Sequence, residues 1–557
     1  MGSSLIFTVV LIAALAGAGV DEGAAALFDG SADLTPQGRI DELVFGRLKQ
    51  LGIPPAAVCS DAVFVRRVYL DVLGTLPTPQ EARDFILDRD PHKRQVLIDR
   101  LLERDEFADY WAMKWSDLLR VKAEFPINLW PNAAQAYHRW IRTAVKQNLP
   151  YDQFARELLT ANGSNFRVGQ VNFYRAVQSK TPQGIAQAVA LTFLGERADK
   201  WPQERLAGMA AFFSQIGFRA TGEWKEEIVS FEPAQRAGGG SSTALFPDGT
   251  QVQLAPDKDP RAVFADWLVS PQNPWFARNI VNRIWFWLLG RGIIHEPDDI
   301  RPDNPPSHPE LLDFLAQDLV AAKYDLKHTC RLILNSKTYQ LSPVARSDRP
   351  EAAAHFASYP LRRLEAEVLI DALNQITGTT EQYSSAIPEP FTFIPEGYRS
   401  IALPDGSITS PFLEMFGRPP RDTGLHAERS NRITPDQRLH LLNSSHIQRK
   451  IEGSPKLQAL LQSAALAGPG KPSRLGAGLK SGKAAKARRS KAAGGPSGIR
   501  QPDSVVNALF LTVLSRFPTR EESAKVAEYV QSATSKREAM IDLAWALINS
   551  AEFLYRH

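Results

Sequence analysis

The chain has 557 residues, of which 44% are hydrophobic and 9% aromatic, a composition that excludes an intrinsically disordered protein and leaves room for about two to four domains. The two cysteines, Cys59 and Cys330, exclude a disulfide framework, and either one bridge between them or two unpaired core thiols fits the sequence. The formal net charge is +4, but residues 468–500 hold nine Lys or Arg and no acidic residue, so the basic character belongs to one segment.

The N-terminus carries an apolar run, LIFTVVLIAALAGAGV (5–20), followed by small residues. This pattern predicts a signal peptide or an N-terminal anchor over residues 1–26, and therefore export to the periplasm or cell envelope. A buried N-terminal helix of a cytosolic protein is the alternative. No other stretch of the sequence is long and apolar enough to cross a membrane, so we expect membrane contact only through this segment, if it is not cleaved.

Helical signals dominate the rest, and the sequence predicts a mostly α, multi-helical fold of two helical domains. Apolar residues between Ile40 and Leu51 recur at three-and-four spacing before Gly52, which is a helix-stop signal. Capping-box patterns begin at Thr78, Ser307 and Thr434. We expect the first helical domain to span 38–222.

A small β-hairpin is predicted between the two domains, over residues 223–256, with its turn at Pro247-Asp248-Gly249. The second helical domain is expected at 257–466 and is completed by a helical hairpin at 502–557.

The basic segment lies between these two parts, at 467–501. Gly, Pro, Ser and Ala dominate it, which favours a disordered, solvated insertion. An arm for phosphate, sulfated glycan or anionic lipid is the alternative. No specific nucleic-acid partner is expected, because the segment has no interleaved aromatic residues and no recognition fold.

Two segments far apart in the sequence resemble each other. FVRRVYLDVLGTLPTPQE (64–81) and VVNALFLTVLSRFPTREE (505–522) align without gaps. Both predict a helix, a tight turn and a capped second helix. We interpret them as related helical hairpins with a structural role, whose packing together would bring the two ends of the chain side by side.

The densest group of polar residues is the loop after the helix at 274–289, GRGIIHEPDDIRPDNPPSHPELL (290–312). His295, Asp298, Asp299 and His308 are the catalytic candidates, because a carboxylate beside an imidazole can move protons or ligate a metal. The spacing matches no metal motif, so no metal site is predicted. A structural network of ion pairs is the favoured interpretation.

Further polar residues are candidates for binding. Asn282 and Arg283 lie on one polar helix face near Trp275, Trp285 and Trp287. They either contact a sugar or pair with the carboxylates of the following loop. Arg301 in that loop is a second partner for these carboxylates. Arg418 and Arg421 can bind a carboxylate or sulfate. The cluster from Arg362 to Asp371 is interpreted as ion pairs along a helix.

Several phrases together resemble a known family. They are FVRRVYLDVLGTLPTPQE (64–81), WAMKWSDLLR (111–120), LPYDQFARELLTANGSN (149–165), the segment 273–316, YPLRRLEAEVLIDAL (359–373), FGRPPRD (416–422) and LHLLNSSHIQRKI (439–451). They resemble a paired family of planctomycete domains of unknown function, a cytochrome-associated N-terminal domain followed by a planctomycete-specific C-terminal one. The resemblance covers residues 38–557.

The resemblance implies an exported, envelope-associated protein without an established reaction. Relatives carry a C-x-x-C-H haem-attachment sequence after a phrase like TFLG, whereas this chain reads LTFLGERADKWPQERLAGMAAFF (191–213). Relatives also have a Cys-x-Cys beside the pair that survives here as Glu428-Arg429. We therefore expect no covalent haem and no other cofactor, and electron transfer only through a separate cytochrome partner.

The sequence has no nucleophile elbow, P-loop or dinucleotide-binding fingerprint. The resulting expectation is an exported helical envelope protein with a binding or assembly role, whose partner is an envelope protein, a cytochrome or an anionic polysaccharide. The alternative is a hydrolase that acts on polysaccharide, with the four catalytic candidates converging on one cleft.

Overall fold

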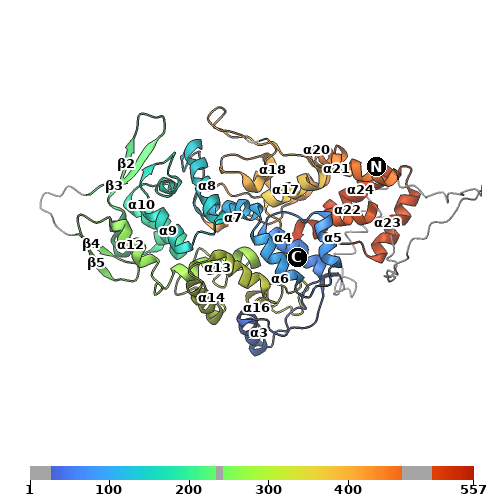
Figure 1. The fold of residues 1–557 in the computed structure, drawn as a ribbon, viewed down its shortest axis with the longest axis horizontal. Coiled ribbons are helices and arrows are strands. Elements are labelled where there is room, and N and C mark those ends of the chain that lie inside the picture. Colours follow the sequence, from blue (N-terminus) through green and yellow to red (C-terminus); the bar gives the residue numbers. More distant parts are fainter. Residues whose placement is uncertain (1–26, 234–241, 395, 467–504) are drawn as a thin grey trace, which may run out of the picture.

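The computed structural model describes residues 27–233, 242–394, 396–466 and 505–557, and it is mostly α-helical, as the sequence predicts. The chain forms an elongated body with short strands at one end and the last helices at the other (Figure 1). The predicted segments 1–26 and 467–501 lie outside the described residues. Among the described residues, no helix has the length and apolarity needed to cross a membrane.

The first part of the chain is built from short amphipathic helices whose ends follow the predicted signals. Gly52 ends the first of them with a left-handed φ of 66°, and Thr78 forms the predicted capping box with Glu81. The helices of this part are α3 (Arg39–Leu51), α4 (Asp61–Val72), α5 (Pro79–Leu87), α6 (Lys93–Leu102), α7 (Asp105–Leu118), α8 (Pro131–Lys146), α9 (Tyr151–Thr160), α10 (Pro182–Val189) and α11 (Gln203–Ala210).

Strands β1 to β5 form two small antiparallel sheets at one end of the body. The predicted hairpin exists as β4 (Ser242–Leu245) and β5 (Gln251–Leu254). Strand β3 (Glu227–Phe231) instead pairs with β2 (Ile216–Ala220) and β1 (Gly163–Ser164), which lie outside the predicted hairpin region. The sequence did not indicate β1, because pairing with a strand more than 60 residues away leaves no local pattern, and it also missed β2, although β2 joins β3 through the short turn at residues 221–226.

The second part begins with α12 (Pro260–Leu268) and the long apolar helix α13 (Phe276–Leu289). It continues through α14 (Pro309–Ala321), α15 (Leu326–Asn335), α16 (Pro350–Ala354), α17 (Ala366–Thr377), α18 (Pro411–Met415), α19 (Pro435–Asn443), α20 (Ser445–Glu452) and α21 (Pro455–Leu466) to α22 (Val505–Val513), α23 (Arg520–Ser532), α24 (Lys536–Ile548) and α25 (Ala551–Leu554). Strands β6 (Arg362–Arg363) and β7 (Tyr555–Arg556) pair antiparallel. Thr434 forms its predicted capping box, but Ser307 does not, because its hydroxyl donates to the carbonyl of Ile293 and His308 takes the N-cap position.

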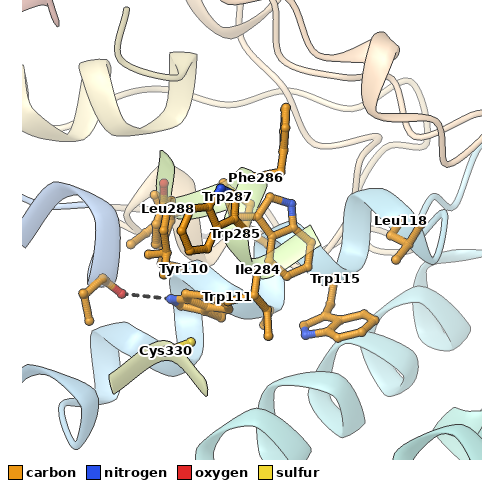
Figure 2. Packing of buried hydrophobic residues seen from close by; sticks show 14 of the residues in the cluster. Tyr110, Trp111, Trp115, Leu118, Ile284, Trp285, Phe286, Trp287, Leu288 and Cys330 are labelled. Atoms are coloured by element: carbon orange, nitrogen blue, oxygen red, sulfur yellow. Dashed lines mark hydrogen bonds between the residues drawn. The ribbon is translucent and has the colours of Figure 1, made fainter. Parts of the chain in front are cut away.

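The two parts share a core where α7 packs near α13 (Figure 2). Trp111 donates its indole N–H to the Val72 carbonyl at 3.2 Å, and its ring meets Trp287 edge to face at 5.5 Å. Trp115 contacts the same Trp287 ring at 5.8 Å. Burying an aromatic ring of this size stabilises the fold by about 1.5–3 kcal/mol, so this junction is strongly held.

The two similar segments form related helical hairpins, α4–α5 and α22–α23, and they pack together, as predicted. Arg66 on α4 donates to the carbonyls of Val513 and Phe553, each at 2.9 Å. The two cysteines do not pair: Cys59 and Cys330 are both buried as free thiols.

Candidate ligand-binding cavity

A polar cavity of about 800 Å³ lies where the two parts of the chain meet, and we call it the junction cavity. Lys114, Asp117 and Leu118 at the end of α7 form one wall. The end of α13, the loop after it, strand β6, residues 424–433 and Tyr555 form the others. Ligand sites favour such junctions, since side chains from two packed units converge there.

Basic side chains dominate the cavity wall. Six of them, Lys114, Arg283, Arg362, Arg363, Arg429 and Arg432, stand against three acidic ones, Asp117, Glu296 and Glu365. The layer behind the wall does not cancel this surplus, because it adds three arginines and three carboxylates, namely Arg418, Arg421, Arg556, Asp71, Asp298 and Glu367. The cavity therefore has a positive potential in a partly desolvated setting, which favours an anion.

Lys114 and Glu365 form the titratable pair on the wall. The ammonium lies 3.1 Å from the Glu365 carboxylate, and both side chains are buried. Burial, together with the nearby Arg556 and Arg429, lowers the pKa of Lys114 to about 8, although Glu365 acts to raise it. Burial acts to raise the pKa of Glu365, but Arg556 and Lys114 outweigh it and hold that pKa well below its usual range.

Arg429 is fixed between two carboxylates. Its guanidinium donates to Glu367 at 2.6 Å and to Asp117 at 2.7 Å. Although burial opposes it, Glu367 and Asp117 raise the pKa of Arg429 well above its usual range, so this group is always charged.

Two imidazoles and aromatic rings supply the less polar part of the lining. The ring of His426 meets Phe286 at 4.2 Å, and His295 stacks on the same ring at 6.3 Å. Burial lowers the pKa of His426 to about 4 and also lowers that of His295, so both rings are neutral at pH 7. Phe286 and Trp287 add flat apolar faces next to these groups.

The four catalytic candidates do not share one cleft. His295 lines the junction cavity, whereas Asp298 is only 1% exposed, receives Arg283 at 2.6 Å and accepts the backbone N–H of His426. Asp299 pairs with Arg301 at 3.2 Å. His308 is buried against the carbonyl of Leu43 at 3.0 Å, on the side facing α3. In the described chain, no three His, Cys, Asp or Glu side chains gather as metal ligands.

Of the predicted binding residues, too, some line the cavity and others lie elsewhere. Arg283 lines the cavity and pairs with Asp298, whereas Asn282 binds the backbone of Ile294 on both sides of its amide. Arg301 bridges Asp299 and Asp303 near the surface. Arg418 and Arg421 are buried behind the wall, where they pair with Glu367 and Asp117. Neither lines the cavity.

Most of the cavity residues were not singled out from the sequence. Lys114 and Asp117 lie in the phrase WAMKWSDLLR, where charged residues among tryptophans indicate polar side chains held inside a packed helix. The cluster beginning at Arg362 was interpreted as ion pairs along a helix, but its members pair between elements: Arg362 with Asp71 and Glu365 with Lys114. Long-range pairing of this kind has no signature in residue spacing.

Comparisons with known proteins agree with this two-part helical frame. The family model PSCyt2, described as a protein of unknown function (DUF1549), matches residues 39–217. The model PSD1, described as a protein of unknown function (DUF1553), matches residues 260–530. The chain belongs to the family that joins these two domains, as the sequence motifs indicated. No curated protein and no solved structure matches it.

The segment that corresponds to the haem-attachment region of relatives does not fit covalent haem. Residues 191–213 contain neither Cys nor His, so no thioether can form there. Glu196 accepts the indole N–H of Trp201 at 2.7 Å and pairs with Arg205 at 3.1 Å, and the Arg205 guanidinium lies over the Trp201 ring. A compact side-chain cluster occupies this part of the chain.

Proposed function

We propose that this protein is an exported, envelope-associated binding protein without covalent haem, and that the junction cavity holds an acidic saccharide. The observation that carries the proposal is the surplus of basic side chains on the wall, six against three. A carboxylate or sulfate on the ligand would complete this charge balance. The faces of Trp287 and Phe286 suit the apolar face of a sugar ring.

The arrangement favours binding over hydrolysis of the ligand. General acid–base catalysis needs two titratable groups that both reach the reacting bond. Among the four candidates only His295 lines the cavity, while Asp298 is saturated by Arg283 and His308 by the backbone of α3. Lys114 and Arg429 on the wall are fixed by ion pairs with Glu365 and Asp117, and Arg363 by backbone carbonyls, which suits a preorganised receptor site.

Calorimetric titration of the purified protein with glucuronate and, separately, with glucose tests the proposal. We expect glucuronate to bind and glucose not to bind. Arg432 is exposed at the cavity rim, so Arg432→Ala should weaken glucuronate binding about tenfold without unfolding the protein. The matched control is Arg438→Ala, an exposed arginine on α19 outside the cavity. Equal affinity for the two sugars, or equal loss in both variants, contradicts the proposal.

The export part rests on the apolar run at residues 5–20 and is tested separately. We expect the protein in the envelope or periplasmic fraction of its host. Mass spectrometry of its N-terminus distinguishes a cleaved signal peptide from a retained anchor. Recovery of the full-length chain in the cytosolic fraction would refute export.

A further inference from the structure

Away from the junction cavity, three loops bring aromatic side chains together on the surface. We call this group the aromatic platform and define it as Trp130, Trp224, Lys225 and Phe391. Trp130 immediately precedes α8, Trp224 and Lys225 lie in the turn between β2 and β3, and Phe391 lies in the loop between α17 and α18. Trp224 is 69% exposed and Phe391 is 51% exposed.

Lys225 links the rings into one surface. Its ammonium lies 5.7 Å from the centre of the Trp130 ring and 5.2 Å from that of Trp224. The ring of Phe391 lies 5.5 Å from Trp130. Two exposed rings, Trp224 and Phe391, and the half-buried ring of Trp130 surround one cation, which is typical of a binding surface and unlike the isolated apolar residues that are normal on proteins.

The backbone at the platform is strained. Trp130 has φ 73° and ψ 147°, close to a region that only glycine populates readily, and Lys225 has φ 64°. A bulky residue in such a conformation costs about 1–3 kcal/mol and persists only where the surrounding structure enforces it, and such residues cluster at binding and active sites. Neither Trp130 nor Trp224 belongs to the hydrophobic core of the described residues, so core packing does not explain the strain.

The charge at the platform identifies the kind of ligand. The carboxylates in and beside the turn between β2 and β3 have cationic partners: Glu227 pairs with Arg175 at 2.7 Å and Lys180 at 3.0 Å, and Glu223 and Glu226 lie 3.7 Å and 3.9 Å from Arg167. Within the described part of the chain, Lys225 has no carboxylate partner. The start of α8, whose N-cap Trp130 provides no side-chain cap, adds the positive end of a helix dipole.

We infer that the aromatic platform binds an acidic polysaccharide, whose sugar rings stack on Trp224 and Trp130 and whose carboxylate or sulfate groups pair with Lys225. A neutral polymer would leave the ammonium without a counter-charge, whereas a sugar acid satisfies both the flat rings and the cation. This surface lies apart from the junction cavity, and the inference does not depend on what that cavity binds.

Electrophoresis of the full chain through native gels that contain alginate, a polymer of sugar acids, or dextran, a neutral polymer, tests the inference. We expect alginate to retard the protein and dextran to leave its mobility unchanged. Trp224→Ala and Lys225→Gln should each weaken the retardation about tenfold, whereas Lys225→Arg should keep it. Both side chains lie in an exposed turn, and circular dichroism checks the fold. Leu87→Ala, at a 58% exposed residue on α5, is the control.

Each remaining outcome overturns the inference. If alginate still retards both Trp224→Ala and Lys225→Gln, the polymer binds elsewhere. The same conclusion follows if Arg432→Ala abolishes the retardation and Trp224→Ala does not. Equal retardation by dextran rules out recognition of the acid. Titration of monomeric glucuronate into Trp224→Ala, which lacks a stacking ring of the platform, reports on the junction cavity, so it separates failure of the platform from failure of the proposed function.

Discussion

Lys114 brings a titratable ammonium into the junction cavity, and its pKa of about 8 makes the proposed binding depend on pH. Below this pKa the side chain is protonated and attracts an anion. Above it the charge is lost, so glucuronate affinity should be constant near pH 7 and fall about tenfold by about pH 9.5. Calorimetric titration across this range measures the effect.

The matched variant for this prediction is Lys114→Arg, which keeps the positive charge at all these pH values. The variant should show a flat affinity profile between about pH 7 and pH 9.5. A wild-type profile that is equally flat would show that Lys114 does not contact the ligand's charge.

Asp71 is the acceptor at the centre of the buried network behind the cavity. It receives Arg556 at 2.8 Å, Arg362 at 3.2 Å and the hydroxyls of Tyr339 and Tyr359. Asp71→Ala leaves two guanidinium groups without this counter-charge, so we expect a loss of about 3–5 kcal/mol in the free energy of unfolding, measured with urea.

An exposed pair on the same protein is the control for this prediction. Asp313 pairs with Arg278 at the surface, and Asp313→Ala should change the free energy of unfolding by less than about 1 kcal/mol. Equal losses in the two variants would mean that the buried network contributes no more than a surface ion pair.

At the scale of elements, each of the two similar hairpins is held by one arginine that pairs with two glutamates, but the arginine lies at a different position of the sequence in each. In α4–α5, Arg104 pairs with Glu81 and Glu106; in α22–α23, Arg516 pairs with Glu522 and Glu552. Glu81 and Glu522 occupy aligned positions, but the position aligned with Arg516 is Thr75. The resemblance in sequence therefore reflects a shared way of bracing the second helix.

The two arginines differ in burial, and this difference predicts unequal losses of stability. The side chain of Arg516 is 5% exposed and that of Arg104 is 30% exposed. Arg516→Ala should lower the free energy of unfolding by about 3–5 kcal/mol, because it leaves two part-buried carboxylates unpaired, and Arg104→Ala by about 1 kcal/mol. Urea unfolding of both variants measures the ratio, and a larger loss in Arg104→Ala would contradict it.

The elements also show what sequence reasoning can reach. Helices were predictable where local signals act within one turn, as in the capping box of Thr78 or the left-handed stop at Gly52. The pairing of β1 with β3 and the acceptor chosen by Ser307 were not, because each depends on a partner from outside the local sequence. The cavity could not be predicted for the same reason, because Lys114 and Glu365, which pair on its wall, are 251 positions apart.

At the scale of the whole molecule, the ends of the chain are joined through buried arginines. Arg66 and Arg67 on α4 donate to backbone carbonyls of Val513, Phe553 and His557, which lie in or after the last helices. Both side chains are at most 1% exposed. The region matched by the N-terminal domain model therefore packs against Val513, inside the region matched by the C-terminal model, and against residues 553–557 beyond it, so the two parts do not form separate bodies.

This architecture predicts that the last helices and α4 open together. Arg66→Met leaves the carbonyls of Val513 and Phe553 buried without donors, at about 1–3 kcal/mol each. Hydrogen exchange followed by mass spectrometry should then show loss of protection in α22, α24 and α25 and in α4, while α8, at a distance from this contact, keeps its protection. Unchanged protection in the last helices would show that they are held by apolar packing alone, since the same variant leaves that packing in place.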